Sequence, residues 1–294
     1  SNDALGRRTQ RIDTTASVTT NDFGYDTRSQ LTNALMGANS FAWLFDNVGN
    51  RKTYTTNGTT YTYLANELNQ YANIANGITN SPTYDPDGNL LTDGKWTNVW
   101  NGENRVVRIE PMSPVNGSES VDLVYDYQGR RCKEEVSVYT NSSWSVVRTN
   151  LWFYDGWNPI CEICHQSSGI TTQAWTHGLD LSGTLQGAGG IGGFLAWTRS
   201  SDSNSFLYLS DANGNITELV NVSNPTNIAA RYQWDAYGDA IAMSGPEVEN
   251  NVFRWSSKYV IVQTGDKDFG YRILRDHRWL SRDPIGEMQL NFRY

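Results

Sequence analysis

Two adjacent residues near the end of the chain, Arg282 and Asp283, have the chemistry of an acid catalyst and lie in the sequence Arg-Asp-Pro-Ile-Gly. A pair of carboxylates that shares one proton can carry out an aspartyl-type cleavage, and a neighbouring guanidinium tunes the pKa of such a pair. No second Asp-Pro-x-Gly follows this one. Arg282 and Asp283 are therefore candidates for autocleavage, with a structural turn set by Pro284 and Gly286 as the competing interpretation.

Two further patterns match cofactor motifs. Cys161 to His165 reads Cys-x-x-Cys-His, which is the spacing that attaches a c-type haem, and Gly187 to Gly192 reads Gly-x-Gly-x-x-Gly, which is typical of dinucleotide loops. Strand and turn signals surround both motifs, whereas a pyrophosphate loop must open a helix. We therefore expect no cofactor and no metal, with a disulfide or weak metal binding at the cysteines as the alternatives.

No hydrolase site is visible, because the three histidines (165, 177 and 277) stand near no Ser or Cys in a nucleophile motif. We expect that the protein is not an enzyme, with autoproteolysis left open. The chain has 23 basic and 31 acidic residues and a formal net charge of −8, which argues against a nucleic-acid partner. It contains no run of about 18 apolar residues, so we expect no membrane span.

Composition favours strands and turns over helices. The 294 residues include 29 Asn, 26 Gly, 11 Trp and 16 Tyr. Asn and Gly are poor in helix interiors and suit turns, whereas Tyr and Trp suit strands. The composition therefore predicts an all-β chain with many turns.

A short turn sequence recurs along the chain. Asp-x-x-Gly begins at Asp3, Asp46, Asp85 and Asp126, and degenerate copies lie between these positions. The resulting step of about 20 residues is two strands and two turns, which is one hairpin. In each copy an aromatic residue ends a strand, Asp caps the turn, and Gly takes the positive φ. We expect a solenoid-like spiral of stacked β-hairpins with little or no helix, as a single segment over residues 1–294.

Three stretches resemble the Rhs (YD-repeat) proteins and their C-terminal repeat-associated core. The first is the Tyr/Phe-Asp-x-x-Gly unit repeated through residues 1–131. The second is a Gly-rich crossing at 178–193, followed by Asp-x-x-Gly turns at Asp211 and Asp235. The third is the terminal motif at 253–294, which contains Arg-Trp-Leu-Ser-Arg-Asp-Pro-Ile-Gly-Glu. The run from Asp268 to His277 departs from the Tyr-rich run of the family.

The resemblance implies a β-shell that encapsulates or presents a C-terminal polymorphic toxin or effector in interbacterial antagonism, as in toxin-complex subunits and, for the fold, teneurins. The implied partners are the other parts of the same shell and the effector, and the implied location is secreted or at the cell surface. The resemblance also implies self-cleavage by Asp-Pro-x-Gly carboxylates. We expect a non-catalytic shell fragment, with an aspartyl-type autoprotease core or a cell-surface module binding carbohydrate or a receptor as alternatives.

Overall fold

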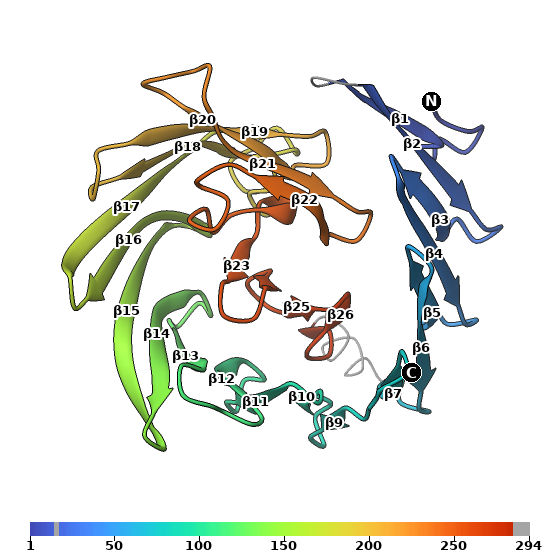
Figure 1. The fold of residues 1–294 in the computed structure, drawn as a ribbon, viewed down its shortest axis with the longest axis horizontal. Helices are drawn as coiled ribbons and strands as arrows, with labels where there is room; N and C mark the ends of the chain where they lie inside the picture. The colour runs from blue at the N-terminus through green and yellow to red at the C-terminus, as the bar shows by residue number, and fades with distance from the viewer. Residues whose placement is uncertain (15–17, 285–294) are drawn as a thin grey trace, which may run out of the picture. The chain divides into compact units, whose positions relative to one another are not determined.

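The computed structural model describes residues 1–14 and 18–284, and their regular structure is β-strand (Figure 1). One turn of 3-10 helix, η1 (Trp255–Ser257), is the sole helical element in these ranges. The predicted all-β fold of stacked hairpins with little or no helix is therefore confirmed. No helix in the described part of the chain is both long and apolar enough to cross a membrane.

The chain divides into two compact units, Ser1–Thr83 and Tyr84–Tyr294, and each is described by itself. The expectation of a single shell segment over 1–294 stays a prediction. The first unit is an eight-stranded antiparallel sheet in which sequence neighbours are sheet neighbours. Its strands are β1 (Gln10–Thr14), β2 (Val18–Tyr25), β3 (Leu31–Met36), β4 (Asn39–Phe45), β5 (Arg51–Thr56), β6 (Thr59–Ala65), β7 (Tyr71–Ala75) and β8 (Thr79–Asn80).

The second unit contains a 14-stranded sheet, again in sequence order. Its strands are β9 (Thr83–Tyr84), β10 (Leu90–Thr92), β11 (Trp96–Trp100), β12 (Val106–Pro111), β13 (Glu119–Tyr125), β14 (Arg131–Thr140), β15 (Ser143–Asp155), β16 (Asn158–Gln166), β17 (Gly169–His177), β18 (Phe194–Arg199), β19 (Ser205–Ser210), β20 (Ile216–Asn221), β21 (Ile228–Trp234) and β22 (Ala240–Ser244). A four-stranded sheet follows, with strands β23 (Tyr259–Ile261), β24 (Asp266–Asp268), β25 (Ile273–Arg275) and β26 (Arg278–Trp279).

The recurring turn has one geometry, which the turn at Asp126 illustrates. Asp126 Oδ1 accepts the backbone N–H groups of Gln128 and Arg130, and Gly129 takes a φ of 79°. A register shift between Val124 and Tyr125 precedes the turn. Because the aspartate satisfies the turn amides and glycine enters the left-handed region without strain, the sequence makes the chain reverse here.

Aromatic side chains link each hairpin to the one before it. The Tyr125 hydroxyl donates to the Val106 carbonyl at 2.8 Å, and the Tyr154 hydroxyl donates to the Arg131 carbonyl at 2.7 Å. In the first unit, Trp43 stacks on its register partner Tyr54. In these hairpins an aromatic side chain contacts the neighbouring hairpin, which is how short hairpins that cannot fold alone form a continuous sheet.

The core of the second unit lies between its two sheets. Figure 1 shows the strands β9–β22 as a curved sheet, with β23–β26 on its concave side. The cluster of buried apolar residues joins Trp152, Trp175 and Trp197 of the long sheet to Phe253 and Ile261 of the C-terminal part. Trp152 and Trp175 stack at 5.4 Å between ring centroids, and the Phe253 ring meets both edge-on. The C-terminal sheet therefore covers the inner face of the curved sheet.

Candidate functional site

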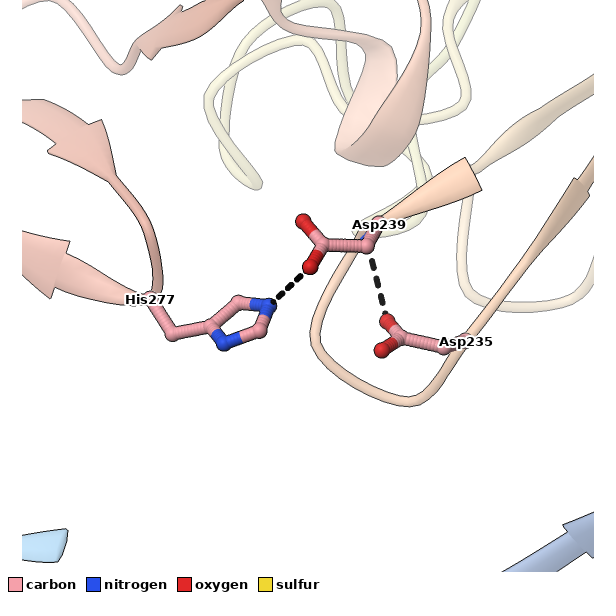
Figure 2. A group of neighbouring side chains, drawn as sticks. All are labelled: Asp235, Asp239 and His277. Carbon is pink, nitrogen blue, oxygen red and sulfur yellow. Dashed lines mark hydrogen bonds and ion pairs between the residues drawn. The ribbon is translucent and has the colours of Figure 1, made fainter. Parts of the chain in front are cut away.

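Asp235, Asp239 and His277 lie together where the last hairpin of the long sheet meets the C-terminal sheet (Figure 2). The two aspartates belong to the turn between β21 and β22, and His277 belongs to the turn between β25 and β26. His277 Nε2 lies 2.8 Å from Asp239 Oδ2. One ligand atom from each of the three side chains, a carboxylate oxygen or an imidazole nitrogen, lies within 4.8 Å of the other two. Two carboxylates and an imidazole at this spacing can bind a cation or exchange a proton.

A second group of charges ties the two sheets together in the interior. Arg275 on β25 bonds to Asp266 on β24 (Nη2–Oδ2 2.6 Å) and to Asp93 (Nη1–Oδ2 3.0 Å). The same guanidinium donates to Asn98 Oδ1 on β11 at 3.1 Å. All four side chains are buried. Arg275 thus compensates two buried carboxylates, a state that is stable only while the partners stay paired.

A third group surrounds Arg131 at the start of β14. Its Nη1 lies 2.6 Å from Glu134 Oε2, and its guanidinium stacks 3.5 Å from the centre of the Tyr259 ring. The Tyr259 hydroxyl donates to Glu134 Oε2 at 2.8 Å. Glu162 on β16 is also buried, and burial together with the Glu134 charge raises its pKa to about 7. This network also fixes the C-terminal sheet against the long sheet.

A cavity of about 320 Å³ adjoins the Arg131 group. Its polar lining includes Arg131, His177, Lys258 and Asp268, and its apolar lining includes Phe194. Burial lowers the pKa of both His177 and Lys258. The volume falls at the lower end of the range for small-molecule pockets.

Asp283 and Arg282 contact different residues in the structure. Asp283 forms an ion pair with Arg272 (Oδ2–Nη2 2.8 Å) and is about half exposed. The Arg282 side chain packs on Gly88, where an added Cβ would require that side chain to shift. The Gly88 turn itself reads Asp-Pro-Asp-Gly, so the Arg282 side chain lies against another Asp-Pro-x-Gly segment, a neighbour that was not predicted from the sequence. Autocleavage at these residues stays a prediction.

The two cofactor-like motifs have structural settings. Cys161 and Cys164 are free thiols on β16, three residues apart, so their side chains point to opposite faces of the strand. The glycine motif lies in the connection 178–193 between β17 and β18, where Asp180 Oδ2 accepts the N–H groups of Ala188 and Gly190. Burial opposes ionisation of Asp180, but hydrogen bonds from the Ser182 hydroxyl and N–H, together with those from Ala188 and Gly190, prevail and lower its pKa to about 2. The loop amides therefore bind a carboxylate of their own chain.

The group of Asp235, Asp239 and His277 was not predicted from the sequence, although one local signal for it is present there. In the turns that begin at Asp46, Asp85 and Asp211, the residue four positions on is Asn. After Asp235 that position holds Asp239. A carboxylate in place of an amide donor distinguishes this turn from the other three. The contact with His277 joins distant parts of the chain, so the turn sequence does not predict it.

Comparison with known proteins supports a β-shell fold. No protein-family model matches the chain. It aligns over 97% of its length with 18% of a chain in the TcdB2–TccC3 crystal structure, with a TM-score of 0.50 and 13% identity. The structure of TcdB2–TccC3 without its hypervariable C-terminal region matches equally well, at 14% identity. The chain thus has a β-shell fold similar to that of the matched part of TcdB2–TccC3.

Curated relatives come from Bacillus. The chain is 27% identical over 232 residues to the tRNA3(Ser)-specific nuclease WapA of Bacillus spizizenii. It is 26% identical over 232 residues to the tRNA nuclease WapA of Bacillus subtilis strain 168. Each match covers 76% of this chain and 8% of the relative. The chain therefore spans a small part of the length of the curated relatives that it matches.

These names contradict one expectation from the sequence. We expected that the protein is not an enzyme, yet the matched relatives are named tRNA nucleases. The expectation failed because it rested on the absence of a familiar nucleophile motif in the repeats, and repeat composition carries no information about an activity defined for a much longer protein.

Proposed function

We propose that this chain forms part of the β-shell of a secreted or cell-surface toxin of the WapA kind, and that the whole protein cleaves tRNA. The observation that carries the proposal is the combination of two similarities over most of the chain. The shell structure of TcdB2–TccC3 matches 97% of it, and WapA sequences match 76%. The partners of this chain are then the other parts of the same shell and the toxin segment.

The physical features of the second unit suit a wall. Its long sheet is a meander in which each strand pairs with its sequence neighbours, so the wall can extend without a separate core for each hairpin. Its inner face is closed by the C-terminal sheet through the Arg275 and Arg131 groups. We infer that these buried pairs hold the wall shut around the enclosed polypeptide.

The test compares tRNA cleavage by the whole protein with that by its Arg275→Ala variant. Arg275 bonds to Asp93 and Asp266 in the interior, so its loss should loosen the wall. We expect the intact protein to cleave added tRNA slowly and to protect its toxin segment from trypsin. The variant should cleave tRNA several-fold faster and lose that protection.

Arg231→Ala provides the matched control, because Arg231 pairs with Glu218 at the partly exposed surface of the 14-stranded sheet of the same unit. It should leave both tRNA cleavage and trypsin protection unchanged. Equal protection in all three proteins would contradict the shell role. If neither the intact protein nor the Arg275→Ala variant cleaves tRNA, although the variant has lost its protection from trypsin, the nuclease part of the proposal is wrong.

A further inference from the structure

The turn from Asp235 to Asp239 breaks the pattern of the others. In three comparable turns, at Asp46, Asp85 and Asp211, Oδ2 of the first aspartate accepts a bond from the Asn side chain four residues on, each at 2.9 Å. Asp235 Oδ1 accepts the Tyr237 and Asp239 N–H groups in the ordinary way. Since Asp239 supplies a carboxylate instead of an amide, Asp235 Oδ2 has lost the donor that the repeat normally provides.

The second carboxylate oxygen of Asp235 is buried without a hydrogen-bond partner. The residue is 4% exposed, so bulk solvent does not supply the missing donor. Figure 2 shows the carboxylates of Asp235 and Asp239 and the His277 ring lying close together. A buried, unpartnered carboxylate oxygen costs free energy unless a proton or a cation satisfies it.

Electrostatics at the group favour added positive charge. Burial and the Asp239 charge raise the pKa of Asp235. Burial also acts to raise the pKa of Asp239, but the hydrogen bond and charge of His277, with Lys267, lower it overall. Lys267 Nζ lies 3.5 Å from Asp239 Oδ1, on the oxygen that His277 does not contact. Asp235 Oδ2 therefore remains the uncompensated atom.

We propose that Asp235, Asp239 and His277 bind a divalent metal ion, and that the ion is Zn²⁺ or Mn²⁺. Carboxylate oxygen and imidazole nitrogen are ligands for both ions, at about 2.0–2.2 Å from Zn²⁺. The three ligand atoms already lie within 4.8 Å of one another, so small side-chain rotations bring them to one ion. Waters complete the coordination.

The ion joins two parts of the second unit. Asp235 and Asp239 lie in the turn between β21 and β22, whereas His277 lies in the two-residue turn between β25 and β26 with a φ of 62°. A metal bond therefore clips the last hairpin of the long sheet to the C-terminal sheet. Because the ligands converge only in the folded chain, binding stabilises the folded state. This inference does not depend on the nuclease assignment.

The test is titration of the purified 294-residue chain with ZnCl₂ and with MnCl₂, followed by calorimetry and thermal unfolding. We expect one ion per chain, a rise in the unfolding midpoint, and X-ray absorption showing nitrogen and oxygen ligands without sulfur. Asp235→Asn should lower the affinity by about 100-fold and abolish the rise. This variant restores an amide to the turn, so it should fold without metal at least as stably as the unsubstituted chain.

Asp211→Asn is the matched control, because Asp211 caps an equivalent turn whose Oδ2 already has its Asn215 partner. It should bind the ion with unchanged affinity. His277→Gln should lose affinity as Asp235→Asn does. The proposal is overturned if the unsubstituted chain binds neither ion, or if the Asp235→Asn variant binds an ion as tightly as the unsubstituted chain. It is also overturned if the bound Zn²⁺ has sulfur ligands from Cys161 or Cys164.

Discussion

Arg275→Ala should lower the free energy of unfolding of the second unit by about 3–5 kcal/mol, the usual cost of removing one partner of a buried ion pair. The substitution leaves Asp93 and Asp266 in the interior, 6% and 1% exposed, without their main cation. Arg278 still approaches Asp93 at 3.3 Å, but the structure gives it no bond to Asp266. Urea unfolding followed by tryptophan fluorescence measures the loss.

Two further variants make the Arg275 result interpretable. Arg231→Ala removes a partly exposed pair with Glu218 and should cost less than about 1 kcal/mol. Arg275→Lys keeps the charge but loses the planar fork that reaches Asp93, Asp266 and Asn98 at once, so its cost should be intermediate. The account of the interior is wrong if Arg275→Ala costs no more than Arg231→Ala.

Glu162→Gln should stabilise the protein at alkaline pH but not at acidic pH. Burial and the Glu134 charge raise the pKa of Glu162 from 4.5 to about 7 in the folded chain. Below pH 4.5 the Glu162 carboxyl is protonated in both the folded and the unfolded chain, and ionisation does not reduce stability. Between pH 4.5 and 7 the carboxyl ionises in the unfolded chain but stays protonated in the folded chain, which lowers the free energy of unfolding. The loss amounts to about 3 kcal/mol by pH 8.

The measurement is urea unfolding of Glu162→Gln and of the unsubstituted chain at pH 4, 5.5 and 8. The advantage of the variant should grow by about 3 kcal/mol across this range, because the Gln amide carries no charge and its oxygen still accepts the Gln173 bond that Glu162 accepts at 2.9 Å. Glu218→Gln, at the partly exposed surface, should change by less than about 1 kcal/mol. A pH-independent difference for Glu162→Gln would contradict the assigned burial effect.

The hairpins were predictable because each one is determined by residues that lie close together in the sequence. An aromatic residue, an Asp cap and a Gly or Asn with positive φ occur within about six residues, so the hairpins could be inferred from turn chemistry alone. The turn at Asp126 shows each of these features in the structure. The sheet order then follows, because consecutive hairpins pair with their sequence neighbours.

The site could not be predicted in the same way, because its contacts join distant parts of the chain. Arg275 lies in the run that departed from the family pattern, and it binds Asp93, 182 residues earlier. His277 had no recognisable partner in sequence, yet the turn between β25 and β26 brings it to Asp239. Only the change from amide to carboxylate at position 239 was a local signal.

A cryo-EM map of the whole protein that contains this sequence tests the central claim most directly. If the chain is part of a shell, residues 84–284 should lie in a continuous β-wall, with the inner face that β23–β26 cover turned toward enclosed density for the toxin segment. A map in which these residues form a separate module, with no wall and no enclosed density, would contradict the shell role.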